Sequence, residues 1–261
     1  MFKENDSMRP GPTPERVLAI CRLLEGHPRT MQELARLTQL DKDPDPSEEA
    51  FRRSVDAAEE LKLIKKEGEQ YEFVGKKEML STTTAFRRTI APIIFSNEKS
   101  TFFKLTEWYI KNDVKMLSLN DARVIAATAS KDGVVMGDRH DVLGWRFWLR
   151  FLGHGYLYNR TVIPNMKVRL DDALLEIEEN TRMTAVQFVS WLKKNVPEAA
   201  AACTGSELPL AVSNGLRTLH EEGRIELIST MDAVKVSLYP IKGVELQDLS
   251  EIVIKGREME A

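Results

Sequence analysis

Residues 143–164 read LGWRFWLRFLGHGYLYNRTVIP, and the order of elements that this stretch predicts occurs again near both ends of the chain. Large aromatic side chains alternate with Arg146 and Arg150 at helical spacing, and then Gly153 and Gly155 interrupt the pattern before a β-rich run. Glycines at the end of a helical pattern, followed by aromatic and β-branched residues, are typical of a helix that leads into a hairpin. The stretch therefore predicts a helix and then two short paired strands.

The same order of elements appears near the N-terminus. Thr13 and Pro14 open a predicted helix that ends at Gly26, with apolar residues at helical spacing between them. A second helix begins at Thr30 with a capping box, and a third begins at Ser47. Two short alternating strands follow around the charged turn KKEGEQ. Three helices and a hairpin in this order predict a winged helix–turn–helix.

A third copy of this order lies near the C-terminus. An amphipathic, strongly acidic helix is predicted over 166–180, and further helices are predicted over 184–192, 197–202 and 208–222. The stretches RIELIS and AVKVSL then alternate at period two around the turn TMDA. We expect these two stretches to pair with each other as a hairpin.

The predicted fold class is mainly α with small β-hairpins, built as tandem winged helix–turn–helix units in an irregularly spaced repeat. The expected domains are an N-terminal winged helix over 1–78, a central helical, winged-helix-like domain over 79–165 and a C-terminal winged helix over 166–261. Pro92 lies in the connector before the central helices. We expect it to break or kink any helix there, because proline lacks the backbone N–H.

Length and composition are those of a globular protein. The chain has 261 residues, of which 43% are hydrophobic and 30% are charged, enough for one large domain or two to three small ones. No apolar run approaches the roughly 18 residues of a membrane helix, and the N-terminal stretch lacks the apolar core of a secretion signal. We therefore expect a cytoplasmic protein with no membrane partner. Cys21 and Cys203 lie in apolar contexts and are expected to be buried free thiols.

Positive charge is concentrated in the middle of the chain. The formal net charge is −3, but residues 81–160 hold 12 Lys and Arg against 7 Asp and Glu. Arg146 and Arg150 are four positions apart and share one helical face, and Arg139 and Arg160 are expected nearby on the flanking loop and wing. Such a cluster suits DNA phosphates. These four arginines are the candidate nucleic-acid-binding residues, and double-stranded DNA is the candidate partner.

The same stretch has alternative interpretations. Trp145 and Trp148 can stack on a single-stranded base, although large aromatic side chains at helical spacing are more typical of a core. The central arginines can instead pair with the acidic helix, whose carboxylates are Asp171, Asp172, Glu176, Glu178 and Glu179. On charge alone, the DNA-binding and ion-pair interpretations are equally supported.

The third helices of the two outer units are weaker candidates for DNA recognition. Arg52 and Arg53 stand among carboxylates, which repel phosphate. Asn214 and Arg217 have side chains that can read bases, but acidic residues follow them and the turn TMDA carries no cation. Both helices are more typical of packing or of protein contact.

No stretch of the sequence has an active-site signature. The sharpest candidate is DRHD at residues 138–141, where His140 lies between two carboxylates and can take part in proton transfer. We favour a solvated loop in which Asp141 caps the next helix. No serine, cysteine or metal-ligand spacing and no glycine-rich phosphate loop is present. We therefore predict a protein that is not an enzyme, with no catalytic residue, cofactor, metal site or small-molecule substrate.

The helix LGWRFWLRFLG at 143–153, placed ahead of VIPN at 162–165 and between winged units, resembles the DpdG-like accessory proteins. Those proteins are encoded beside bacterial clusters that insert 7-deazaguanine bases into DNA and restrict unmodified DNA. The resemblance implies a non-catalytic DNA-binding or adaptor subunit of a bacterial DNA-modification or anti-phage defence assembly, with other protein subunits of that system as partners. The alternatives are a winged-helix transcriptional regulator and a purely structural protein-interaction module.

Overall fold

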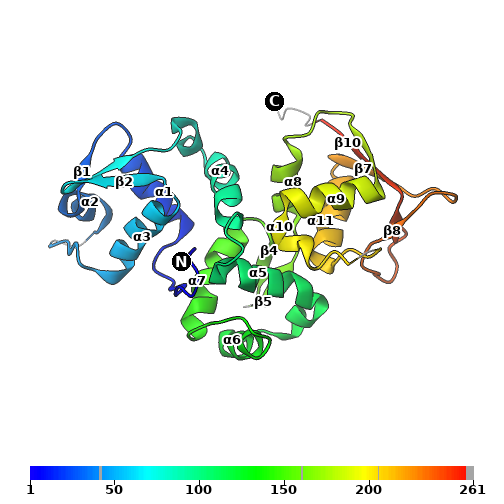
Figure 1. The fold of residues 1–261 in the computed structure, drawn as a ribbon, viewed down its shortest axis with the longest axis horizontal. Coiled ribbons are helices and arrows are strands. Elements are labelled where there is room, and N and C mark those ends of the chain that lie inside the picture. Colours follow the sequence, from blue (N-terminus) through cyan, green and yellow to red (C-terminus); the bar gives the residue numbers. More distant parts are fainter. Residues whose placement is uncertain (41–42, 160, 205, 257–261) are drawn as a thin grey trace. The chain divides into compact units, whose positions relative to one another are not determined.

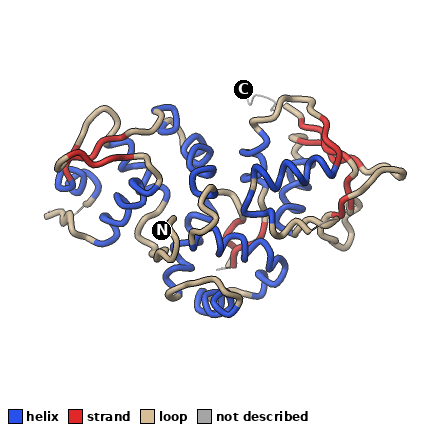
Figure 2. The backbone as a smooth tube through the Cα atoms, in the orientation of Figure 1, coloured by secondary structure: helices blue, strands red, loops and turns tan. Residues whose placement is uncertain are grey.

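The computed structural model of the chain describes residues 1–40, 43–159, 161–204 and 206–256. About half of the chain is helical, and the strands form small antiparallel sheets (Figure 1 and Figure 2). The predicted class, mainly α with small β-hairpins, is confirmed at this level. The chain divides into two compact units, the first made of Met1–Lys104 and Ala122–Phe151 and the second of Leu105–Asp121 and Leu152–Ala261. The bounds of the three predicted domains stay predictions.

The first unit is mostly helical and holds one small sheet. In chain order its elements are α1 (Pro14–Leu23), β1 (Arg29–Thr30), α2 (Met31–Thr38), α3 (Glu49–Glu60), β2 (Ile64–Glu67), β3 (Gln70–Phe73), the 3-10 helix η1 (Lys77–Leu80), α4 (Thr83–Phe95), the start of α5 (Thr101–Asn112), α6 (Ala122–Lys131) and α7 (Arg139–Phe151). The sheet has the antiparallel order β1-β3-β2.

The predicted starts of the first two helices are confirmed. The Thr13 side chain accepts a hydrogen bond from the backbone N–H of Arg16, and proline occupies the first helical position of α1. At α2, Thr30 accepts from the backbone N–H of Glu33 at 3.3 Å, and the Glu33 carboxylate accepts from the backbone N–H of Thr30 at 2.7 Å. These bonds satisfy N–H groups that a helix leaves without partners in its first turn.

Pro92 was expected to break or kink any helix in the connector, and it does not break one. Helix α4 continues past it to Phe95, and the carbonyl oxygen of Pro92 accepts from the backbone N–H of Ser96 at 3.0 Å. Buried apolar side chains on both sides of the proline, including Ile90 and Ile94, hold α4 against the core. Tertiary packing therefore offsets the lost backbone hydrogen bond.

Helix α7 is held in the first unit by the N-terminal segment. One carboxylate oxygen of Asp141 accepts from the Ser7 hydroxyl at 2.9 Å and from the backbone N–H of Met8 at 2.8 Å. Gly144 lies directly against the Met8 carbonyl, where an added Cβ would approach the oxygen to 1.7 Å. The ring of Phe2 packs edge-on against Trp148 with centroids 4.9 Å apart. The helix thus forms part of the core of this unit.

The second unit contains the remaining elements. They are the end of α5, the 3-10 helix η2 (Asp113–Ser118), β4 (Gly155–Tyr158), β5 (Thr161–Pro164), α8 (Lys167–Leu174), β6 (Arg182–Thr184), α9 (Ala185–Asn195), α10 (Pro197–Ala200), α11 (Leu210–Glu221), β7 (Ile225–Ile228), β8 (Val236–Ser237), β9 (Asp248–Leu249) and β10 (Glu251–Ile254). Strands β4 and β5 pair antiparallel, which confirms the hairpin predicted after the tryptophan-rich helix.

The predicted C-terminal hairpin is wrong. Strand β7 pairs with β10, in the sheet order β6-β10-β7, and β8 pairs instead with β9. Three consecutive residues of β10, Ile252, Val253 and Ile254, are buried, whereas Val234 in the predicted partner stretch is 74% exposed. Burial of the more continuous apolar strand decides the pairing, and local alternation alone could not reveal it.

Both cysteines are buried and free, as predicted. Burial raises the pKa of the Cys21 thiol and of the Cys203 thiol to about 12, so both remain protonated and unreactive near neutral pH. In the part of the chain that the structure describes, no helix is both long and apolar enough to cross a membrane.

Candidate functional site

Three of the four predicted DNA-binding arginines lie on helix α7. Arg139 and Arg146 are seven positions apart and Arg146 and Arg150 are four apart, so the three share one face of the helix. Arg139 and Arg150 are exposed, whereas Arg146 is half-buried. Arg160 lies outside the described residues. The accessible positive charge on this face is therefore carried by Arg139 and Arg150.

The tryptophans between these arginines belong to the core. Trp145 and Trp148 are both fully buried. The indole N–H of Trp148 donates to the carbonyl oxygen of Pro12 at 2.6 Å, which satisfies its one polar atom. The alternative that these two rings stack on a nucleic-acid base is wrong, because no base can reach them in this structure.

His140 lies at the surface beside Asp138 and Arg9. Its Nδ1 is 3.2 Å from a carboxylate oxygen of Asp138, and the same carboxylate accepts from Arg9 at 3.1 Å. The hydrogen bonds from His140, together with Arg9, hold the pKa of Asp138 well below its usual range. The second oxygen of Asp141 accepts from the backbone N–H of Gly137 at 2.8 Å, so that carboxylate serves the loop and the N-terminal segment. The expectation of a solvated loop in which Asp141 caps the helix is wrong, because α7 already begins at Arg139 and Asp141 is buried in its first turn.

Helix α11 cannot read bases with the residues that the sequence offered. Arg217 is only 7% exposed, and its guanidinium donates to the carbonyl oxygens of Tyr239 at 2.9 Å and of Leu246 at 3.0 Å. The side-chain amide of Asn214 donates to the carbonyl oxygen of Pro164 at 3.2 Å. The segment between β7 and β10 thus covers the helix face that carries Arg217. The base-reading interpretation of these two side chains is wrong.

Helix α3 of the first unit presents mixed charge. Arg53 pairs with Glu49 at 2.8 Å, and Arg52 is exposed on the same helix with Asp56. On the adjoining hairpin, Lys65 pairs with Glu67 at 2.6 Å and with a second glutamate. Exposed carboxylates beside these cations lower the attraction for phosphate, which agrees with the sequence-based interpretation of this helix.

A buried ionic cluster that sequence reasoning missed lies inside the second unit. One carboxylate oxygen of Glu198, on α10, accepts from Arg169 on α8 at 2.7 Å and lies 2.9 Å from Nε2 of His154. Arg169 also donates to the carbonyl oxygen of Asn195 at 3.1 Å. All three charged or titratable side chains have almost no exposed surface.

The electrostatics of this cluster follow from its contacts. Burial alone raises the pKa of Glu198, but the charge of Arg169 and the hydrogen bond from His154 outweigh it and lower the pKa to about 2. The carboxylate is therefore ionised at neutral pH. Because no substrate can reach these atoms, we assign the cluster to stability, where it joins the start of the β4-β5 hairpin to α8 and α10. The only sequence signal is a glutamate inside the apolar run VPEAAAAC.

The described residues contain no group of three or more His, Cys, Asp or Glu side chains that could hold a metal ion. Over residues 8–233 the sequence matches the model of a protein family described as DpdG-like. The resemblance inferred from the tryptophan-rich helix is thereby confirmed. No curated protein and no solved structure matches the chain.

Proposed function

Because the chain belongs to the DpdG-like family, we propose that it is a non-catalytic adaptor subunit of a bacterial 7-deazaguanine DNA-modification system. Family membership associates the chain with that system and thereby with a set of several proteins. The adaptor role, in which the chain binds another protein of the system, is our inference from the surfaces described above.

We infer that the adaptor is built from winged helices. In the first unit the order α1-β1-α2-α3-β2-β3 is combined with the sheet order β1-β3-β2. In the second unit the order α8-β6-α9-α11-β7-β10 is combined with the sheet order β6-β10-β7, with α10 and the β8-β9 pair as additions. In both, the last residue of the first strand, Thr30 or Thr184, is the threonine of a capping box. The two sets of elements therefore correspond one to one.

The observation that carries the adaptor proposal is the covered face of α11. A winged helix that reads DNA places its third helix in the major groove. Here the guanidinium of Arg217 on that helix is already used by two backbone carbonyl groups. The corresponding helix of the first unit, α3, carries exposed carboxylates. Neither helix therefore offers an open basic face to phosphate, which favours a protein partner over direct DNA recognition by these two helices.

The adaptor proposal is tested by co-expression of the tagged chain with the proteins encoded beside it, followed by purification and size-exclusion chromatography. We expect a stoichiometric complex with at least one of them that survives about 300 mM salt, which weakens phosphate contacts strongly. Nuclease treatment before purification controls for bridging by DNA. If the chain elutes alone from every co-expression, the adaptor role is refuted.

Direct DNA binding is the second candidate, and the exposure of Arg139 and Arg150 on one face of α7 supports it. We would titrate a mixed-sequence duplex by fluorescence anisotropy between about 50 mM and 200 mM salt. DNA binding through this face predicts that Arg139→Glu/Arg150→Glu weakens binding and lowers the salt slope by roughly 2, since each phosphate contact contributes about 0.9. Lys193→Glu/Lys194→Glu makes the same charge change on exposed positions of α9 and serves as the matched control. Equal losses in both variants would exclude a site on α7.

A further inference from the structure

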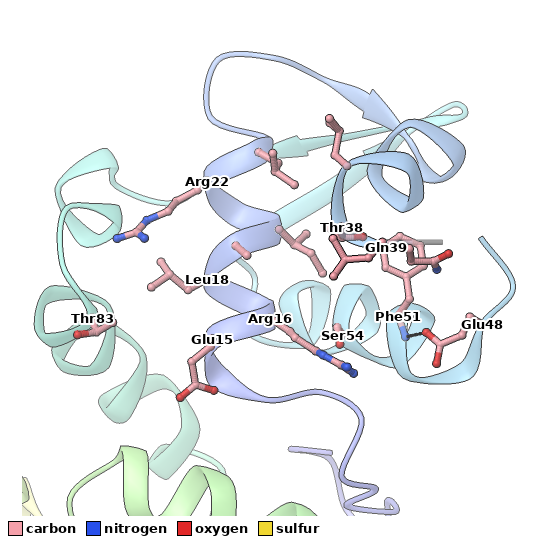
Figure 3. Close-up of a pocket in the computed structure, with 15 residues that line it drawn as sticks. Glu15, Arg16, Leu18, Arg22, Thr38, Gln39, Glu48, Phe51, Ser54 and Thr83 are labelled. Atoms are coloured by element: carbon pink, nitrogen blue, oxygen red, sulfur yellow. Dashed lines mark hydrogen bonds between the residues drawn. The ribbon is translucent and has the colours of Figure 1, made fainter. Parts of the chain in front are cut away.

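A groove of about 920 Å³ runs along α1 in the first unit, between the end of α2 and the start of α3 (Figure 3). Buried apolar side chains of α1 and α3 line it, among them Leu18, Ile20 and Phe51, and Figure 3 shows Leu18 on the side of α1 toward Thr83. Two leucines at its edge are exposed to solvent, Leu37 by 52% and Leu40 by 105%. An open apolar groove bordered by exposed leucines is typical of a surface that binds another protein.

The part of α1 that faces this groove is shaped for a helix. Arg16, Ala19 and Leu23 follow one another at spacings of three and four, so they share one face, and Ala19 is exposed. The single methyl group of Ala19 lets the backbone of a second helix come close to α1. An amphipathic helix laid in the groove would bury its own apolar stripe together with Leu37 and Leu40.

The charges at the two sides of the groove differ. Beside Leu40, the amide of Gln39 donates to the carbonyl oxygen of Asp45 at 2.7 Å, which places the acidic loop, here residues 43–48, next to the exposed leucine. Exposed carboxylates at this side are contributed by Asp43, Asp45 and Glu48. In the sequence, residues 43–51 hold four Asp and Glu and no lysine or arginine, and Lys42 and Arg52 flank this stretch. This side therefore attracts a cation.

The arginines that line the groove have contacts with backbone oxygens. The guanidinium of Arg16 donates to the carbonyl oxygen of Gly11 at 3.0 Å, and that of Arg22 donates to the carbonyl oxygen of Leu80 at 2.9 Å. Figure 3 shows Arg22 and Glu48 on opposite sides of α1. The positive charge of Arg22 is thus directed away from Glu48, whereas Arg16 extends toward Ser54 on the side of Glu48 and is bound there by the carbonyl oxygen of Gly11.

We propose that this groove is the docking site for an amphipathic helix of a partner protein, with its apolar stripe against α1, Leu37 and Leu40 and a Lys or Arg against the acidic loop. This proposal deepens the adaptor function and rests on it. Apolar contact supplies the affinity, and the carboxylates of Asp43, Asp45 and Glu48 fix the direction in which the helix lies.

The test uses two fluorescein-labelled peptides of about four helical turns that share one apolar heptad pattern. Both peptides have leucine at the apolar positions, and the polar positions are lysine in one peptide and glutamate in the other. We expect the lysine peptide to bind the full-length protein at physiological salt about tenfold or more tightly than the glutamate peptide. The variant Leu37→Asp/Leu40→Asp should weaken binding of the lysine peptide by about tenfold or more, because two apolar contacts are lost.

The choice of aspartate separates apolar docking from simple charge attraction. Aspartate adds negative charge, so binding driven only by charge would become tighter in this variant, and that result would overturn the proposal. Val186→Asp/Val234→Asp makes the same chemical change at exposed positions of the second unit and should leave binding unchanged. Circular dichroism and thermal melting check that both variants fold. Binding that is weakened equally by both variants would also overturn the proposal.

Two further outcomes separate this proposal from the function it rests on. If the chain forms a complex with a co-expressed protein and Leu37→Asp/Leu40→Asp leaves that complex intact, the groove is refuted while the adaptor role stands. If the chain forms no complex with any co-expressed protein, the adaptor role is refuted, and the groove proposal that rests on it is refuted as well. Sedimentation velocity of the protein alone should show a monomer. A dimer that the same variant dissociates would assign the groove to a second copy of this chain and overturn the partner that we propose.

Discussion

Removing the charge of Glu198 should destabilise the second unit more than the loss of any exposed ion pair. The substitution Glu198→Gln keeps the shape of the side chain but removes the negative charge that faces Arg169 at 2.7 Å and His154 at 2.9 Å. All three side chains are shielded from water, so solvent cannot replace the lost interaction. Breaking a buried pair by removing one partner costs about 3–5 kcal/mol. We expect a loss of that size in the free energy of unfolding.

Urea denaturation followed by circular dichroism measures this loss, with Glu251→Gln as the matched control. Glu251 pairs with Arg182 at 2.6 Å, but both side chains reach solvent. An exposed pair contributes about 0–1 kcal/mol, so the control should change stability very little. If Glu198→Gln falls within about 1 kcal/mol of the control, the buried cluster does not hold α8 and α10 as we argue.

Two additional measurements examine the same reasoning. The double variant Arg169→Met/Glu198→Leu removes both charges, so it should lose less stability than Glu198→Gln, because no charge is left facing a neutral partner. The folded-state pKa of Glu198, about 2, is below its ordinary value of 4.5. The stability that Glu198 contributes is therefore complete above pH 4.5 and disappears as the pH falls toward about 2. Glu198→Gln should abolish that part of the acid sensitivity.

Three other substitutions follow from contacts in the structure. Gly144→Ala places a Cβ 1.7 Å from the Met8 carbonyl oxygen, so it should lower the free energy of unfolding by about 1–3 kcal/mol or more in a urea titration. Trp148→Phe removes the 2.6 Å hydrogen bond to the Pro12 carbonyl and should cost about 1–3 kcal/mol in the same assay, whereas no loss would show that this bond is unimportant. Burial raises the pKa of Asp113 from 3.8 to about 6, so the wild-type protein loses stability as the pH rises through this range. Asp113→Asn keeps an acceptor for the backbone N–H of Leu210 at the start of α11, and it should stabilise the protein above pH 6 but not below pH 3.8. Thermal melting across this pH range measures the effect. A difference in melting temperature between the two proteins that does not change with pH would contradict the reasoning.

The candidate site shows what the sequence left open. The helical spacing placed Arg146 and Arg150 on one face of α7, and the structure keeps that arrangement. Arg139, which was expected on the flanking loop, instead begins the helix and lies on the same face. Helical spacing could not show that Arg146 is half-buried, because burial depends on the neighbours that tertiary folding brings together. Nor could it show that Arg217 is covered, since the carbonyl groups that bind it lie 22 and 29 residues further along the chain.

Local elements of this protein were determined by the sequence itself. The caps at Thr13 and Thr30 and the hairpin after Gly153 each depend on residues within a few positions of one another, where geometry is set by the backbone. Such signals are short-range, and they survive in the folded structure because packing agrees with them.

Only the tertiary structure decided the long-range features. The partner of β7, the continuity of α4 through Pro92, the buried cluster around Glu198 and the groove beside Leu40 each involve competition between segments that are far apart in the chain. The outcome of that competition depends on how much apolar surface each arrangement removes from water, and on whether each buried charge finds a partner. Neither quantity can be read from residue spacing, because both exist only when the chain has folded.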